Sequence, residues 1–219
     1  MRETRFSPVA GTSLYTLAVV LAAFELFVAW QAFHPNVSAT YRSYYIDETT
    51  TCLDQPVAGT YRFGTTVSFR SGNEPAIKPI RVCGWEGPAG DGLHSVGESS
   101  RLRFALPAGA DKLSLTVELV AVDFAKGGAQ PVDIVVNGRT LARLDVHAGT
   151  PQSFTLDVPD ALLQPGKPLD VELQYPEAIR VGADDPNTRK RSIKLTEARV
   201  NSSDPALLDL ERQETKGLA

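Results

Sequence analysis

The chain has 219 residues, of which 42% are hydrophobic and 22% are charged, proportions that are normal for a folded protein. The length suits one domain of ordinary size plus an appendage. The formal net charge of -4 offers no basic footprint and argues against a nucleic-acid partner. The 17 glycines and 15 prolines fall mostly between short apolar runs, which indicates a β-rich fold with many turns.

An apolar run opens the chain. Residues 13–33 are long enough for a helix that crosses a bilayer. Tyr15 and Trp30 stand near the two ends of the run, where interfacial aromatic residues are expected. We therefore predict a transmembrane helix over residues 13–33.

The charges on either side of this run predict its orientation. Arg2 and Arg5 precede it, and no further Lys or Arg occurs until Arg42. The positive-inside rule then places residues 1–12 in the cytoplasm and exports the rest of the chain. We interpret the run as an uncleaved signal anchor. The alternative is a cleavable signal peptide that is cut near residues 37–39.

Glu25 is the one acidic residue in the run. An ionised carboxylate at mid-membrane costs at least ~2.5 kcal/mol. Ala22, Glu25 and Ala29 share one helical face, and small residues let helices approach closely. We predict that this face binds a transmembrane helix of a polytopic membrane protein. The alternative is that Glu25 is protonated and faces lipid, or is satisfied by its own helix.

Short apolar segments with turn residues between them follow a juxtamembrane linker at residues 34–59. Asn137-Gly138 joins two of these segments and is the strongest short hairpin signal. The pattern predicts an all-β fold, a jelly-roll type β-sandwich over residues 60–200, after one N-terminal transmembrane helix and before a polar tail at 201–219. The expected strands lie at 60–69, 78–85, 100–107, 114–122, 132–146, 153–159, 169–176 and 191–200.

Cys52 and Cys83 are the only cysteines. An oxidising compartment predicts a disulfide between them, which would close a loop of about 30 residues and add roughly 3–4 kcal/mol of stability. Two free buried thiols are the alternative. No histidine lies near either cysteine in the sequence, so we predict neither a metal site nor a cofactor here.

Two groups of oxygen-bearing side chains are candidates for chemistry. The first group lies in a Gly-rich loop: Glu86, Asp91 and Glu98. Two of these residues could form the carboxylate pair of a glycoside hydrolase. The simpler interpretation is a solvated loop. The second group is Asp184, Asp185 and Asn187. These residues could bind Ca²⁺ through their oxygen atoms, or they form an ordinary turn. Neither forms a persuasive catalytic set, and we predict that the protein is not an enzyme.

The stretch GWEGPAGDGLHSVGESSRLRFALP, followed by VVNGRTLARLDV, FTLDVP and DDPNTRKRSIKLTEARV, has a recognisable pattern. It resembles the carbohydrate-binding-module-like jelly rolls of bacterial membrane glycosyltransferases and envelope polysaccharide proteins, over residues 84–200. The resemblance implies an inner-membrane protein with a periplasmic jelly roll. The chain departs from that pattern in having one membrane helix and no glycosyltransferase domain, which suggests an accessory subunit.

Two functions follow from these expectations. The first is a non-catalytic accessory subunit of an envelope polysaccharide synthase or glycosyltransferase. The second is a carbohydrate-binding module that holds a glycan at the outer face of the inner membrane. The candidate sugar-binding aromatic residues are Trp85, Tyr61 and Tyr175. For Trp85 the sequence favours a core or rim position over a sugar contact. Four basic residues lie close together in the sequence: Arg189, Lys190, Arg191 and Lys194. They could bind an acidic glycan, lipid headgroups or an acidic partner. The alternative is that they form a solvated face of a strand.

Overall fold

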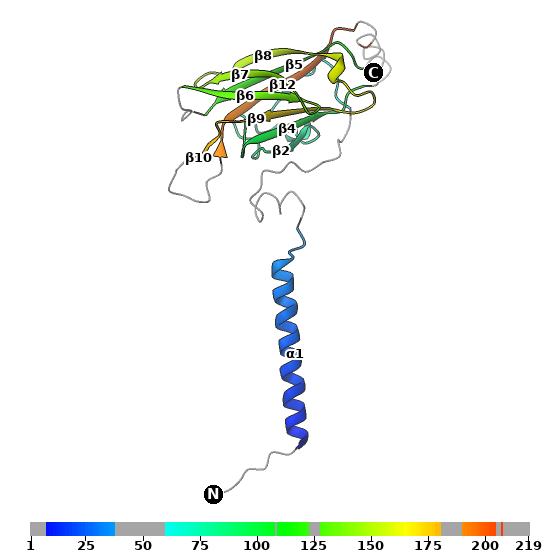
Figure 1. The fold of residues 1–219 in the computed structure, drawn as a ribbon, viewed down its shortest axis with the longest axis vertical. Helices are drawn as coiled ribbons and strands as arrows, with labels where there is room; N and C mark the ends of the chain where they lie inside the picture. The colour runs from blue at the N-terminus through cyan, green and yellow to red at the C-terminus, as the bar shows by residue number, and fades with distance from the viewer. Residues whose placement is uncertain are drawn as a thin grey trace. The chain divides into compact units, whose positions relative to one another are not determined.

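The computed structural model describes residues 8–37, 60–107, 109–122, 128–180, 190–204 and 207. The chain divides into two compact units, Met1–Arg42 and Ser43–Ala219. In the first unit, α1 is one uninterrupted helix, Pro8–Phe33 (Figure 1). It begins five residues before the predicted start because proline is well tolerated in the first turn of a helix.

The span Tyr15–Phe33 is long and apolar enough to cross a membrane. The predicted N-terminal apolar helix is therefore confirmed. A signal sequence passes the same test, so the choice between a signal anchor and a cleavable signal peptide stays a prediction.

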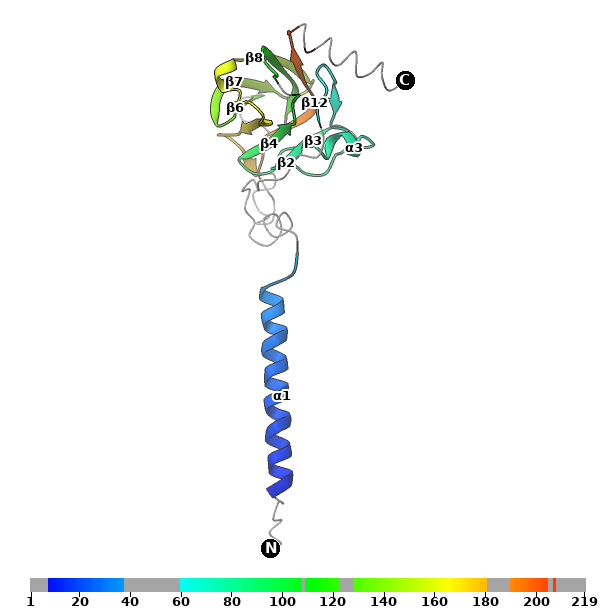
Figure 2. The same ribbon diagram turned by 90° about the vertical axis from the view of Figure 1, so that its right-hand side faces the viewer.

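The second unit is a sandwich of two antiparallel sheets (Figures 1 and 2). The first sheet has the order β1-β12-β5-β8, with β3 also paired to β12: Val67–Ser68, Ile193–Ser202, Leu113–Ala121, Gln152–Val158 and Leu93–His94. The second has the order β2-β4-β9-β6-β7: Arg81–Cys83, Ser99–Phe104, Leu169–Gln174, Ala129–Val136 and Arg139–His147. A separate ribbon pairs β10, Ile179–Arg180, with β11, Lys190–Arg191.

The chain passes repeatedly from one sheet to the other. Strand β4 belongs to the second sheet, β5 to the first, β6 and β7 to the second, β8 to the first and β9 to the second, before β12 closes the first sheet. Such crossing connections are typical of jelly rolls. The predicted all-β sandwich of jelly-roll type, preceded by one apolar helix, is confirmed.

The hairpin at Asn137-Gly138 forms as predicted between β6 and β7. Asn137 has a φ of 48° and Gly138 a φ of 81°. Two consecutive positive φ angles are the requirement of a type I′ turn, which matches the right-handed twist of the flanking strands.

Strand β12 contains a β-bulge, and its sequence shows why. Ile193 and Leu195 point into the core, whereas the next inward residues are Ala198 and Val200, so the alternation changes phase. The register against β5 shifts between Leu195 and Glu197, where one extra residue is accommodated. The bulge lets both halves of the strand bury their apolar side chains.

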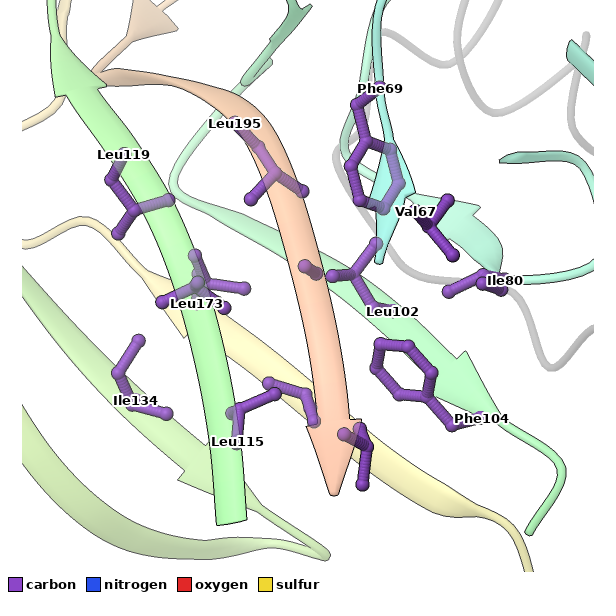
Figure 3. Packing of buried hydrophobic residues seen from close by; sticks show 14 of the residues in the cluster. Val67, Phe69, Ile80, Leu102, Phe104, Leu115, Leu119, Ile134, Leu173 and Leu195 are labelled. Carbon is purple, nitrogen blue, oxygen red and sulfur yellow. The ribbon is translucent and has the colours of Figure 1, made fainter. Parts of the chain in front are cut away.

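The core lies between the two sheets. Figure 3 shows Leu115 and Leu119 of β5 and Leu195 of β12 packing with Leu102 of β4 and Leu173 of β9, and all five side chains are fully buried. Complete burial of one such side chain stabilises the fold by roughly 1.5–3 kcal/mol. This packing fixes the two sheets face to face and so determines which loops meet at each end of the sandwich.

The expected strand at 60–69 is mostly wrong, because only Val67–Ser68 joins a sheet. The hydroxyl of Tyr61 donates to the Thr65 carbonyl and accepts a hydrogen bond from the Val200 amide, with an oxygen–nitrogen distance of 3.0 Å. This side chain takes the place that a neighbouring strand would occupy. The expected strand at 78–85 shortens to three residues.

Several short elements were not predicted from the sequence: α3 at Glu74–Ile77, β3 at Leu93–His94 and the β10–β11 ribbon. Figure 2 shows α3 and β3 on the same side of the domain. A one-turn 3-10 helix, η3, occupies Asp160–Leu162.

Candidate functional site

The exposed apolar surface is concentrated on α1. Among the described residues, every large hydrophobic side chain that is exposed belongs to this helix, between Tyr15 and Phe33. Glu25 is exposed on the same helix, on the face that also carries Ala22 and Ala29. Within the described residues of this unit, no neighbour covers these side chains.

Tyr61, one of the predicted sugar-binding aromatic residues, is a core residue with 7% of its surface exposed. Its ring packs edge-to-face on Phe104, with ring centroids 5.1 Å apart. Because its hydroxyl also holds Thr65 and Val200, both ends of the side chain are used in folding.

Trp85 and Tyr175 are buried as well, with 7% and 1% of their surface exposed. The Trp85 indole donates to the Arg101 carbonyl oxygen at 3.1 Å. Burial raises the pKa of the Tyr175 hydroxyl far above its ordinary value. The core reading of Trp85 therefore fits the structure. None of the three predicted rings presents a face on which a sugar can stack.

The acidic loop and the basic group meet in space and form one charged cluster of ion pairs. Its members are Glu86 with Arg191, Glu98 with Lys190, and Asp91 with Lys194 and His94. The Arg191 Nη2–Glu86 Oε1 distance is 2.5 Å, and the Lys194 Nζ–Asp91 Oδ2 distance is 3.1 Å. Each of these three acids has a Lys or Arg as partner.

Asp91 shows how strongly the charged cluster favours the ionised acid. A hydrogen bond from His94 Nε2 at 3.1 Å, followed by one from Lys194, lowers the pKa of the Asp91 carboxyl to about 2. The side chain remains 55% exposed, so solvent screens these interactions. The arrangement pins the Gly-rich loop to β12 and explains these residues without catalysis.

Partly buried charges also tie the second sheet together across β4 and β9. Arg103, 9% exposed, binds Asp170 through two hydrogen bonds of 2.5 and 2.8 Å. Arg101 and Glu172 form a longer pair at 3.5 Å. A bidentate guanidinium–carboxylate pair fixes register as well as charge.

The opposite end of β4 and β9 holds a cavity of about 260 Å³, which we call the end cavity. It lies between the segment that follows β4, residues 106–107 and 109–111, and the loop that precedes β9, residues 163–168. Two carboxylates line it, Asp111 and Asp160, and Lys167 and Gln164 stand at its exposed rim. The sequence marks both segments as loops, but only the fold brings them together.

Asp111 is unusual within this cavity. Its Oδ1 atom is shielded from solvent and has no hydrogen-bond partner in the described part of the chain. Asp160, by contrast, accepts a hydrogen bond from the Lys112 amide at 3.1 Å. An unpaired buried carboxylate oxygen costs stability, which makes Asp111 the polar group most in need of an explanation.

Several predicted residues lie outside the described part of the chain: Cys52, Asp184, Asp185, Asn187 and Arg189. Cys83 ends β2 and is half-buried. The disulfide between Cys52 and Cys83 therefore stays a prediction, as does the choice between a calcium site and a turn.

No protein-family model matches the chain, and no curated protein matches it either. Among solved structures, the CBM36-1 domain of a xylanase from the hindgut metagenome of Trinervitermes trinervoides is 13% identical, with a TM-score of 0.38, covering 64% of this chain and 98% of that one. The xylan-binding module CBM15 is 12% identical, with a TM-score of 0.42, covering 71% and 98%. A family 35 carbohydrate-binding module from Clostridium thermocellum is 8% identical, with a TM-score of 0.38, covering 64% and 100%. Scores this low carry no argument about a ligand.

Proposed function

We propose that this chain is a non-catalytic glycan-binding module that is held by α1 at the outer face of a bacterial inner membrane. One observation carries the proposal: the exposed large hydrophobic side chains gather on α1, whereas the described part of the sandwich exposes no large hydrophobic side chain. A bilayer covers the first kind of surface, and a hydroxyl-rich ligand or water suits the second.

Two further features support this reading. In the charged cluster, Glu86, Asp91 and Glu98 each form an ion pair, which gives them a structural role rather than a catalytic one. Arg2 and Arg5 favour a cytoplasmic N-terminus, and hence a periplasmic sandwich, through the positive-inside rule.

The test is glycan binding by the full chain reconstituted in lipid nanodiscs. Purified envelope polysaccharides and their oligosaccharide fragments serve as ligands, with isothermal calorimetry as the readout. We expect saturable binding to at least one glycan and no hydrolysis or transfer products. A folded chain that binds none of them would contradict the proposal. Trp85→Ala is not a useful variant, because a buried indole reports on stability rather than on ligand contact.

Glu25 favours a second candidate function, an accessory subunit of an envelope polysaccharide synthase or a polytopic glycosyltransferase. Its carboxylate is exposed in the apolar span of α1, where it costs at least ~2.5 kcal/mol in lipid when ionised. A hydrogen-bond donor on a partner helix removes that cost, and Ala22 and Ala29 allow such a helix to approach closely.

Co-purification from membranes tests this second function. The tagged full chain is extracted in a mild detergent, and mass spectrometry identifies the proteins that accompany it. We expect Glu25→Leu to release a polytopic membrane protein that the unmodified chain retains. Phe27→Leu, about half a helical turn away, is the matched control and should retain it. Equal recovery with Glu25→Leu would count against the helix face as a binding surface.

A further inference from the structure

The end cavity has fixed walls. The Asn137 side chain donates to the Leu162 carbonyl at 2.7 Å and accepts from the Asp170 amide at 3.0 Å, which holds the β8–β9 connection against the β6–β7 turn. The Lys167 amide closes a turn onto the Gln164 carbonyl at 3.0 Å. Pro165 and Pro168 restrict this loop further. A cavity that exists before its ligand arrives loses little entropy on binding.

The lining combines the two kinds of surface that a sugar ring needs. Leu106, Leu163 and Pro165 offer apolar walls to the C–H faces of a ring. Asp111 and Asp160 offer carboxylate oxygens as acceptors for hydroxyl groups. Hydrogen bonds to ionised acceptors are among the strong ones in proteins.

Asp111 supplies the sharpest indication of a ligand. Its Oδ1 atom lacks a donor, although the residue lines a cavity that has room for one. The terminal torsion of a carboxylate is broad and roughly two-fold, so a small rotation turns an oxygen toward the cavity. A ligand hydroxyl would reach the orphaned Oδ1, which is shielded from solvent in this structure, only after such a rotation.

The rim adds two polar groups whose side chains take no part in the hydrogen bonds of the described residues. Lys167 and Gln164 are both exposed, and neither side chain makes a hydrogen bond or ion pair within the described residues. With two carboxylates and one ammonium group, the lining carries a net negative charge, which disfavours acidic sugars.

We infer that the end cavity binds the terminal sugar unit of an uncharged glycan, with Asp111 as the principal hydrogen-bond acceptor. This inference rests on the proposed glycan-binding function and adds the site and the class of sugar. The volume of about 260 Å³ lies just below the usual range for drug-sized ligands, so the cavity accommodates the end of a glycan and not a long stretch of it.

Binding of simple sugars to the full chain tests the inference. The protein is held in nanodiscs or in a detergent without a sugar headgroup, because a maltoside or glucoside would compete for the site. The probes are the methyl glycosides of glucose, galactose and N-acetylglucosamine, with the methyl glycoside of glucuronic acid as the acidic comparison. Amide chemical shifts of Gly109 and Gly166 report whether the sugar lies in the end cavity.

Two variants and one control sharpen the result. Asp111→Ala should weaken binding of the neutral sugar about 10-fold to 100-fold, the effect of losing a hydrogen bond to a charged group. It should leave the thermal midpoint unchanged or raise it, because the lost oxygen has no partner. Gln164→Ala removes an exposed rim amide and cannot unfold the domain. Asp157→Ala, an exposed carboxylate on β8, should bind like the unmodified chain.

The outcomes separate the site from the function. Neutral sugars that bind, shift Gly109 and Gly166, and lose affinity with Asp111→Ala support the inference. Sugars that bind equally well to the Asp111→Ala and Gln164→Ala variants overturn this site but leave the proposed function standing. Tighter binding of the glucuronide overturns the class of sugar. No binding of any probe overturns the site, and the failure of the longer envelope glycans as well would overturn the function.

Discussion

Gly84 should tolerate no side chain, although it is not in the hydrophobic core. It has a φ of 75°, and a Cβ built there would lie 2.2 Å from the Ser99 carbonyl oxygen and 2.6 Å from the Ser100 Cα. Both obstacles are backbone atoms of β4. Gly84 is also fixed in place, because its carbonyl accepts hydrogen bonds from the Ser100 hydroxyl at 2.5 Å and the Val96 amide at 2.8 Å.

The cost of Gly84→Ala has two parts. The left-handed backbone conformation costs an alanine about 1–2 kcal/mol. The strand must also yield by about 0.8 Å to reach the 3.0 Å that real Cβ contacts respect, and overpacking of this kind costs about 1–3 kcal/mol. The sum of about 2–5 kcal/mol is a large share of the stability of an ordinary domain.

Urea unfolding followed by tryptophan fluorescence measures this effect. The chain has two tryptophans, Trp30 and Trp85, so a Trp30→Phe background confines the signal to the sandwich. Gly87→Ala is the matched control in the same loop, since Gly87 has nothing within 4 Å of its Cβ position. We expect the control to be neutral or slightly stabilising. A loss below about 0.5 kcal/mol for Gly84→Ala would refute the close packing of this loop on β4.

Three other predictions follow from contacts in the sandwich and its linker. Arg103→Met should cost about 1.5–3 kcal/mol in urea unfolding, because it removes the hydrogen bonds to the half-buried carboxylate of Asp170 on β9; full recovery in Arg103→Lys would contradict the bidentate geometry. The hydrogen bond from His94 lowers the pKa of Asp91 to about 2, so its contribution is complete above pH ~4 and is lost as the pH falls toward 2. That contribution is less than about 1 kcal/mol, and Asp91→Asn should flatten this part of the stability profile; an unchanged profile would count against the interaction. Reduction of the purified chain should raise its mass by about 2 Da if Cys52 and Cys83 are bridged, and Cys83→Ser should then cost about 3–4 kcal/mol. An unchanged mass would favour two free thiols.

Local signals in the sequence were enough for much of the fold. The apolar run predicts α1, because a helix satisfies its own backbone hydrogen bonds. Asn137-Gly138 predicts the β6–β7 hairpin, because both residues tolerate positive φ. The change of phase in the apolar residues of β12, from Ile193 and Leu195 to Ala198 and Val200, is the sequence mark of the bulge.

The sequence alone did not decide which polar and aromatic side chains face one another. Alternation assigns a residue to one face of a strand, but it does not say whether a later segment will cover that face. Tyr61 and Trp85 therefore read as sugar platforms until the sandwich closes over them. Glu86 and Arg191 lie more than 100 residues apart and read as separate acidic and basic groups until β11 brings them together.

The length and apolarity of α1, the hairpin and the alternating strands are properties of neighbouring residues, and the amino-acid sequence determined them by itself. The paired charges, the buried rings and the end cavity depend on contacts between distant segments, and only the tertiary structure decided them. The physical reason is that backbone conformation is set largely by local sterics and hydrogen bonding, whereas burial and charge pairing depend on which surfaces the packed sheets bring into contact.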